Sequence, residues 1–453
     1  MLDISVDFNN ITGRIKPMHA VNNGPYGSRG SANGWIFQTL GIPYARNHDA
    51  AFSAAYGGEH AIDVVNIFRN FDADENDPAS YDFILTDVTI KNAIDAGVTP
   101  YYRLGNKIEH EVKKYGTNPP KDFAKWARIC EHIIAHYTEG WDDGFRYDMP
   151  YWEIWNEPEC RGGIVNDRLC WQGTDEEFFA FFAIAAKHLK NRFPHLKIGG
   201  AAVTWMGRDN AFVRPFLAYL KEHDVPLDFY SYHGYGADPH SFAEEEKYTR
   251  EVLKEYGYEN CETHLNEWNY NVGWYHEAMI RSYRGIRTVK GAAFVAASML
   301  TMQKSTLDLF MYYDARPGTL YNGIFEAGTF DLFPPFCSFY AFNELYQLGN
   351  ECESVCNDYD VYVGAAKKDG KAAVVLSYYK DAENLEAKDI RLSIAHKEAM
   401  KVTCRTVDEE TCGALNGTKT IAPHRVDYIS GDRTELYVHM EPNTVTVLSF
   451  EEV

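Results

Sequence analysis

Short apolar runs alternate with amphipathic helical patterns over most of this 453-residue chain, and this alternation constrains the fold more than any other feature. It is typical of repeated strand–helix units. Helical patterns cover residues 82–96, 120–137, 176–192 and 212–223, among others. The strand-like runs between such patterns are eight in number, at residues 16–21, 42–48, 98–104, 151–156, 197–204, 228–233, 263–267 and 307–313. Eight units of this kind predict an α/β fold, a (β/α)8 TIM barrel with loop insertions.

The pattern of apolar and polar residues changes after a helical stretch at residues 336–348. Turn signals such as Asp369-Gly370 and Pro442-Asn443 now separate runs that alternate apolar and polar residues, at 361–366, 372–379, 390–395, 435–440 and 444–450. This pattern predicts a smaller C-terminal antiparallel β-sandwich at residues 349–453, beside a barrel at 16–348. Residues 1–15 are strand-like and are expected to join the β-sandwich.

Two of the expected barrel strands end in a carboxylate. Residues 151–158 lead to Glu157, and residues 263–269 contain Glu267, 110 positions further along. At ~30 residues per strand–helix unit, this spacing places the two carboxylates on the fourth and seventh strands, across the barrel mouth from each other. Barrel enzymes hold their chemistry at the carboxyl ends of the strands, and a pair of carboxylates is the minimum equipment for hydrolysing a glycosidic bond.

The two carboxylates are expected to have different roles. Glu157 follows an aromatic strand, where an apolar pocket and a second carboxylate raise the pKa of a general acid. Asn156 can direct its amide at the sugar 2-hydroxyl. Glu267 would be the ionised nucleophile, with a lowered pKa because a hydroxyl such as that of Tyr235 donates to it.

Other polar residues at strand ends are candidates for contact with a sugar. His48 and His233 can donate hydrogen bonds to hydroxyl groups, although either can equally be structural. Trp268, next to Glu267, completes the expected substrate-binding set. Asp314 and Arg316, after the eighth strand, form either an ion pair at the rim or a substrate contact.

Several functional classes are disfavoured by composition and missing motifs. A net charge of −21 argues against a nucleic acid or an anionic membrane as partner. No phosphate-binding loop, Gly-x-Ser-x-Gly or His-Glu-x-x-His motif is found, and the acidic run at residues 72–77 departs from a calcium loop, so neither a cofactor nor a metal is expected. Nine scattered cysteines, no Cys-x-x-Cys pair, no long apolar segment and no secretory signal favour a cytoplasmic protein with reduced thiols. Homo-oligomerisation is left open.

Four segments resemble glycoside hydrolase family 39, a clan A family of β-xylosidases and α-L-iduronidase. They are residues 152–158 around Glu157, residues 265–268 around Glu267, His233-Gly234-Tyr235, and Arg46-Asn47-His48. The resemblance implies Glu157 as acid/base, Glu267 as nucleophile and a retaining double displacement without a metal. The chain departs from the family pattern at residues 102–106, which lack the usual acidic residue, and at residues 312–317.

The choice of sugar lies between neutral pentosides and anionic uronides. A uronide needs a fixed cation, and the arginines near strand ends are Arg46, Arg103, Arg208 and Arg316. Arg46 is expected to be structural, and acids neighbour Arg208 and Arg316, so an exo-acting enzyme for a neutral, β-xyloside-like substrate is predicted. The sequence leaves open β-glucosides, β-galactosides, α-L-arabinopyranosides and uronides, and also a barrel that binds carbohydrate without hydrolysing it.

Overall fold

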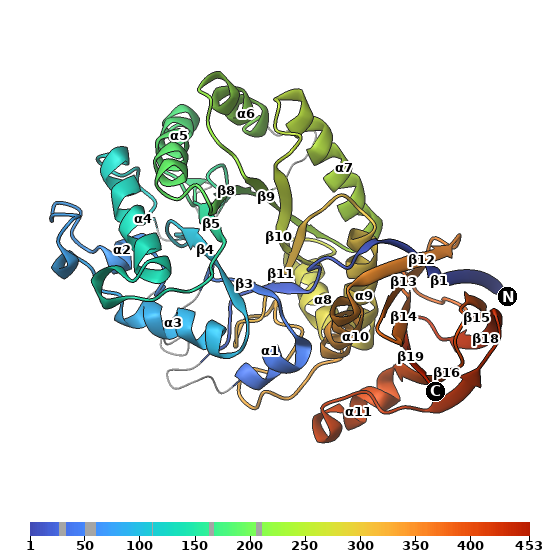
Figure 1. Ribbon diagram of the computed structural model, residues 1–453. Coiled ribbons are helices and arrows are strands. Elements are labelled where there is room, and N and C mark those ends of the chain that lie inside the picture. The colour runs from blue at the N-terminus through green and yellow to red at the C-terminus, as the bar shows by residue number, and fades with distance from the viewer. Residues whose placement is uncertain (27–32, 50–59, 111, 163–166, 205–210) are drawn as a thin grey trace.

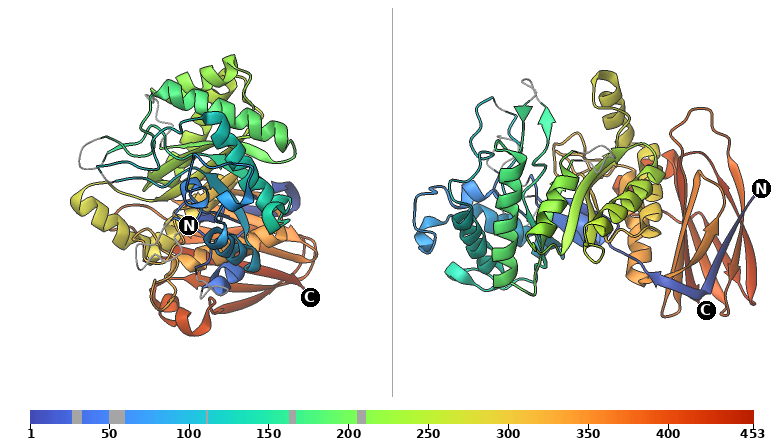
Figure 2. Two further views of the ribbon diagram at one scale, coloured as in Figure 1. Left: turned by 90° about the vertical axis from the view of Figure 1, so that its left-hand side faces the viewer. Right: turned by 90° about the horizontal axis from the view of Figure 1, so that it is seen from above.

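The computed structural model describes residues 1–453 except 27–32, 50–59, 111, 163–166 and 205–210. A closed barrel holds the N-terminal three quarters of the chain, and a large β-sheet stands beside it (Figure 1). Seen from above, the barrel and the sheet lie side by side, and both chain termini are at the sheet (Figure 2).

The barrel consists of eight strands that pair in parallel with their neighbours and close into a ring. The predicted (β/α)8 barrel is therefore confirmed, and each of the eight expected runs contains part or all of one strand. In ring order the strands are β2 (Ala20–Asn22), β3 (Tyr44–Arg46), β4 (Thr99–Leu104), β5 (Tyr151–Ile154), β8 (Lys197–Val203), β9 (Phe229–Gly236), β10 (Glu262–Tyr270) and β11 (Leu309–Tyr312).

Helices surround the barrel and cover it with apolar side chains. In α5 (Asp175–Arg192), Thr174 and Glu177 form a capping box, acidic residues fill the first turn and basic residues the last, in keeping with the helix dipole. The other barrel helices are α1 (Gly34–Leu40), α2 (Val64–Ile67), α3 (Ile84–Asp95), α4 (Phe123–Thr138), α6 (Val213–Glu222), α7 (Pro239–Glu255), α8 (His276–Ile286), α9 (Val289–Gln303) and α10 (Pro335–Leu348). Two short 3-10 turns, η2 (Pro78–Ser80) and η3 (Trp141–Asp143), and a small hairpin, β6 (Arg161–Gly162) with β7 (Asp167–Arg168), lie between them.

The second sheet has nine strands in the order β17-β16-β19-β14-β13-β12-β1-β15-β18. Neighbours are antiparallel except β1 and β15, which run parallel. Its strands are β1 (Leu2–Arg14), β12 (Asn350–Cys356), β13 (Val361–Lys368), β14 (Lys371–Tyr378), β15 (Lys388–Ala395), β16 (Met400–Val407), β17 (Arg425–Ile429), β18 (Arg433–Met440) and β19 (Thr444–Glu452), with α11 (Glu409–Thr418) between β16 and β17.

The two halves of this sheet share one apolar core, so the mostly antiparallel sheet packs like a sandwich. Leu392 of β15 and Val6 of β1 belong to the same buried cluster as Val374 of β14 and Leu448 of β19. The segment Leu2–Arg14 thus provides an inner strand of the second sheet. The domain limits drawn from the sequence stay a prediction.

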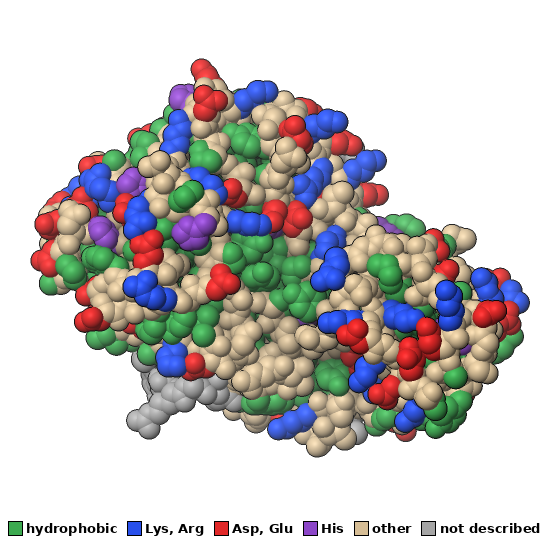
Figure 3. Space-filling view, viewed as in Figure 1, with side chains coloured by type: hydrophobic (Ala, Val, Ile, Leu, Met, Phe, Trp, Pro, Cys, Tyr) green, Lys and Arg blue, Asp and Glu red, His purple; other side chains and the backbone are tan. Residues whose placement is uncertain are grey.

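Helices α9 and α10 connect the barrel with the second sheet. They pack on β13 and β14, and α9 also contacts β19. Val375 and Val447 on that face of the sheet belong to the same buried cluster as the barrel residue Trp268. None of the helices in the described part of the chain has the length and apolarity that crossing a bilayer requires. Acidic and basic side chains are interspersed on the face shown in Figure 3.

Candidate active site

The turn after β5 directs Asn156 and Glu157 to the carboxyl end of the barrel. The indole of Trp155 is fully buried and packs edge-on against Trp171 and Phe181, which fixes the start of the turn. The backbone N–H of Glu157 donates to the carbonyl of Ala202 at 2.9 Å. Trp155 and Glu157 both have positive φ (72° and 46°), a conformation that costs non-glycine residues free energy and is characteristic of functional turns.

Glu267 lies near the carboxyl end of β10, beside a register shift in the ladders to both neighbouring strands. Its carboxylate accepts two hydrogen bonds, one from Arg46 Nη1 at 2.7 Å and one from the Tyr235 hydroxyl at 2.9 Å. The side chain is 7% exposed. The donor role expected for Tyr235 is therefore matched by the geometry.

A buried polar network supports these groups from inside the barrel. Arg46, fully buried, donates to Glu153 at 2.7 Å, to Asn156 Oδ1 at 2.6 Å and to Asn22 at 3.1 Å. Ser231 donates in turn to Glu153 at 2.6 Å. Arg46 thus connects β5, through Glu153, with β10, through Glu267, and it holds Asn156 in position.

Sequence reasoning did not identify Glu153 as part of this network, although a signal was available. Glu153 lies on β5, two residues after Tyr151. Because alternate side chains of a strand point to the same side, Glu153 and Tyr151 share one side of β5. An acid on the inner side of a barrel strand needs a partner because a buried charge is costly when unpaired. Arg46, which the sequence marked as structural, is that partner and also contacts Glu267 directly.

Two histidines flank the carboxylates. His233 Nδ1 lies 2.6 Å from Glu157 Oε1 and 3.5 Å from Glu267 Oε2, and His48 Nε2 lies 3.7 Å from Glu267 Oε1. Burial lowers the pKa of His233 to about 4 and that of His48 well below its usual value, so both rings are neutral near pH 7. Within the described residues, His233 Nε2, His48 Nδ1 and Asn156 Nδ2 are buried without the hydrogen-bond partner that a buried polar atom usually has.

Burial raises the pKa of both Glu157 and Glu267 to about 7. For Glu267 this differs from the lowered pKa expected from the sequence, because loss of hydration outweighs the hydrogen bonds that favour its charged form. An oxygen of Glu157 and an oxygen of Glu267 lie within 4.8 Å of one another, so the two groups titrate as a pair. Of the two carboxyls, Glu267 and not Glu157 accepts hydrogen bonds from Arg46 and Tyr235, which favours the charged form of Glu267 over that of Glu157.

Glu157, His233 and Glu267 are also close enough together to share a metal ion, since one ligand atom from each lies within 4.8 Å of the others. Arg46 already supplies a fixed positive charge at Glu267, which disfavours a divalent cation at the same oxygens. The group is better suited to proton transfer than to metal coordination.

Trp268 is not brought to this site. Its indole is fully buried and stacks on Phe310 at a centroid distance of 4.0 Å, in the layer between barrel and helices. Successive side chains of a strand point to opposite sides, so placing Glu267 inside the barrel turns Trp268 outward. The prediction that Trp268 binds substrate did not take this alternation into account.

Residues after β3 and β11 form one side of the site. Asp314 is fully buried, and Arg316 lies 3.7 Å from its carboxylate and 3.9 Å from that of Asp49. Arg316 is therefore paired with acids, as one of the two alternatives from the sequence proposed. Arg103 is fully buried and pairs with Asp63 at 2.7 Å. Arg208 lies outside the described residues.

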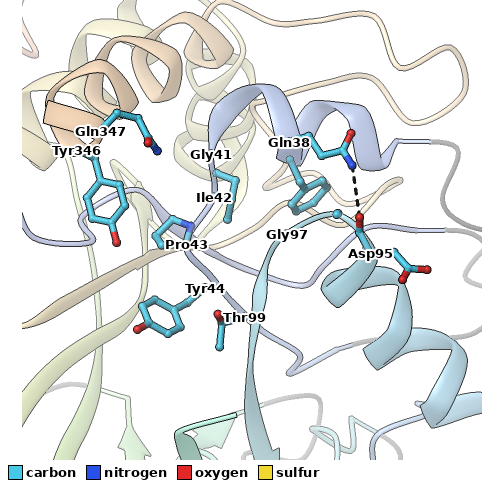
Figure 4. Close-up of a pocket in the computed structure, with 12 residues that line it drawn as sticks. Gln38, Gly41, Ile42, Pro43, Tyr44, Asp95, Gly97, Thr99, Tyr346 and Gln347 are labelled. Carbon is cyan, nitrogen blue, oxygen red and sulfur yellow. Dashed lines mark hydrogen bonds between the residues drawn. The ribbon is translucent and has the colours of Figure 1, made fainter. Parts of the chain in front are cut away.

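A separate pocket of about 550 Å³ opens at the other end of the barrel (Figure 4). Its lining includes Pro43, which precedes β3, and Thr99, which begins β4. Among the described residues that line it, Asp95 is the one carboxylate. This pocket lacks the paired acids found at the carboxyl ends of the strands.

The paired carboxylates at the mouth of a (β/α)8 barrel define the class of protein, a glycoside hydrolase. The sequence profile of Glycosyl hydrolases family 39 matches residues 35–313, and the chain belongs to this family.

Two curated β-xylosidases are similar to this chain in sequence, and solved structures share its fold. A β-xylosidase of Geobacillus stearothermophilus is 25% identical over 384 residues, covering 75% of this chain and 68% of the relative. A β-xylosidase of Caldicellulosiruptor saccharolyticus is 26% identical over 208 residues, covering 44% of this chain and 38% of the relative. Among solved structures, a glucosidase from Croceicoccus marinus has a TM-score of 0.81 at 20% identity, with 100% of this chain and 99% of that chain covered. A monomeric β-xylosidase from Caulobacter crescentus has a TM-score of 0.72 at 17% identity, with 100% of both chains covered.

Proposed function

We propose that this protein is a retaining exo-glycosidase that hydrolyses a neutral β-linked glycoside, with Glu157 as acid/base and Glu267 as nucleophile. The observation that carries the proposal is a pair of buried carboxyls, Glu157 and Glu267, with an oxygen of each within 4.8 Å of the other. Of the two, Glu267 accepts hydrogen bonds from an arginine and a tyrosine. Retaining enzymes hold the two groups ~5–5.5 Å apart, whereas inverting enzymes need ~6.5–9.5 Å to admit a water.

The reaction has two steps. Glu267 attacks the anomeric carbon while Glu157 gives its proton to the departing glycosidic oxygen, which forms a glycosyl ester on Glu267 and releases the alcohol. Glu157, now ionised, then takes a proton from a water that attacks the anomeric carbon, and Glu267 leaves as a carboxylate. Asn156 Nδ2 supports this course, since it is held by Arg46 beside the two acids and has no partner of its own among the described residues.

The arginines support a neutral sugar over a uronide. Arg46 and Arg103 are fully buried and paired with Glu153 and Asp63, and Arg316 stands between two carboxylates. Within the described part of the chain, each of these guanidinium groups already has a carboxylate partner, which reduces the positive charge that a substrate carboxylate would meet. The two β-xylosidase relatives make an aryl β-xyloside the first substrate to test.

Trapping the intermediate with a 2-deoxy-2-fluoro glycoside tests the assignment. The adduct should be found by mass spectrometry on the peptide that contains Glu267, and Glu267→Gln should neither form it nor turn over an aryl glycoside. The sugar is chosen beforehand by measuring kcat/KM on aryl xyloside, glucoside, galactoside, arabinopyranoside and uronides. An adduct on another residue, or a product of inverted anomeric configuration, contradicts the mechanism. No hydrolysis of any of these glycosides favours a carbohydrate-binding barrel instead.

The proposal leaves two expectations from the sequence as predictions. These are a cytoplasmic location and the possibility of homo-oligomerisation. Size-exclusion chromatography with light scattering can measure the oligomeric state.

A further inference from the structure

Asp49 is an acidic residue at the mouth of the barrel to which the reaction assigns no task. It follows His48 and lies three residues beyond the carboxyl end of the barrel strand β3. Its backbone N–H donates to Asn23 Oδ1 at 2.9 Å, which fixes the turn. The side chain is 11% exposed, so it is largely buried and still reachable from the site.

The surroundings of Asp49 keep its carboxylate charged. Burial disfavours ionisation, but the Arg316 guanidinium and the Tyr313 hydroxyl favour the charged form, and the pKa of Asp49 lies well below its usual value. The Tyr313 hydroxyl donates to Oδ2 at 2.6 Å, and Arg316 Nη2 lies 3.9 Å from the same oxygen.

The other oxygen, Oδ1, is different. Its nearest cationic or imidazole neighbours are His48 Nε2 at 3.6 Å and His60 Nδ1 at 4.0 Å, both beyond hydrogen-bond distance. Among the residues that the structure describes, no side chain or backbone group donates to Oδ1. A charged acceptor of this kind takes a donor from a ligand or from water.

Asp49 is also at a suitable place relative to the reacting carbon. His48 Nε2 lies 3.7 Å from the Glu267 carboxylate and 3.6 Å from Asp49 Oδ1, so one ring nitrogen separates the two acids. A pyranose whose anomeric carbon is at Glu267 can extend its more distant hydroxyls toward Asp49.

We infer that Asp49 is a specificity-determining residue that accepts a hydrogen bond from the 3- or 4-hydroxyl of the sugar and repels a carboxylate at the far side of the ring. The inference rests on the proposed function and adds to it the group that selects a neutral sugar. A hydroxyl is a donor to Oδ1, whereas a uronate brings a second negative charge to the same place.

The test compares parent, 3-deoxy and 4-deoxy aryl glycosides of the sugar that the wild type prefers, together with the matching uronide. In the wild type, removing the contacted hydroxyl should lower kcat/KM by about 10- to 150-fold, the range of a hydrogen bond to a charged group. In Asp49→Asn, kcat/KM on the parent should fall, the discrimination against that deoxy analogue should shrink to about 5-fold or less, and the uronide-to-parent ratio should rise.

Asp95→Asn is the matched control, because it removes the same charge at the other end of the barrel and should keep the wild-type discrimination. A purely structural role for Asp49 would lower kcat/KM on all substrates by the same factor, which overturns the inference. Wild-type enzyme that tolerates both deoxy analogues overturns it without any variant. Wild-type enzyme that hydrolyses none of the glycosides counts instead against the proposed function.

Discussion

The two carboxyl groups of the site differ mainly in the hydrogen bonds that they accept. Glu267 accepts from a cation and a hydroxyl, whereas Glu157 has the neutral ring of His233 at 2.6 Å. Burial raises the pKa of Glu157 to about 7, so Glu157 stays protonated up to that pH and loses the proton above it. A general acid with this pKa matches neutral working conditions.

Replacing Glu157 by Gln should therefore affect substrates according to their leaving group. With a poor leaving group, kcat/KM should fall ~10²–10⁴-fold, because protonation of the departing oxygen is lost. With a good leaving group the first step should be nearly spared, and azide should restore turnover of the glycosyl-enzyme. The wild type should lose kcat/KM as the pH rises above about 7, and Glu157→Gln should lack this limb of the pH profile.

Glu159→Gln provides the control for that experiment. Burial also raises the pKa of Glu159 to about 7, but its carboxylate accepts hydrogen bonds from the backbone and hydroxyl of Thr204, at 2.6 and 2.8 Å. It should keep the alkaline limb of the wild-type profile. Equal losses of Glu157→Gln on good and poor leaving groups, or loss of the limb in Glu159→Gln, would contradict the role of Glu157.

The sequence predicted which strand ends form the site better than it predicted the direction of single side chains. Glu157, Glu267, His233 and Tyr235 come together because the carboxyl ends of parallel strands meet at one end of a barrel. Trp268 does not join them, because the direction of a side chain depends on register, which a register shift in β10 makes hard to infer from spacing.

At the scale of elements, β1 is the least local part of the fold. It begins the chain and yet lies between β12 and β15, pairing with segments more than 330 residues away. Ile4, Val6 and Phe8 alternate into the core of the second sheet. Phe8, which is 2% exposed, meets Phe450 of β19 edge-on at 5.1 Å. The alternation is visible in the sequence, but the partner strands of β1 are not, because pairing at such a distance leaves no local pattern.

Phe8→Ala should destabilise the protein substantially. Truncating a buried phenylalanine leaves a cavity and costs ~3–5 kcal/mol of the free energy of unfolding. Ile11→Ala on the same strand is the control, since Ile11 is 49% exposed and should change stability by only ~0.5 kcal/mol or less. Denaturant unfolding followed by far-ultraviolet circular dichroism measures both. Similar costs for the two variants would show that β1 does not contribute to the core as described.

At the scale of the whole molecule, the barrel and the second sheet share apolar packing through α9 and α10. The twelve buried residues of α9 surround the helix, as expected for a helix with protein on all sides. Eight barrel strands were evident from the sequence because each is a compact apolar run. The packing of α9 between the barrel and the second sheet was not evident from the sequence, because a helix buried all round has no amphipathic period that points to its neighbours.

The shared core predicts that the barrel and the second sheet unfold together. The nine tryptophans all lie at or before residue 274, so their fluorescence reports on the barrel and not on residues 349–453. Val375 and Val447 of the sheet belong to the same buried cluster as Trp268, so loosening the sheet removes packing from the barrel helices. Phe8→Ala, a change within the sheet, should therefore lower the midpoint of the tryptophan transition as much as that of circular dichroism, in a single step. A tryptophan midpoint equal to that of the wild type, with two steps in circular dichroism, would mean that the two parts are independent and that α9 and α10 join them only loosely.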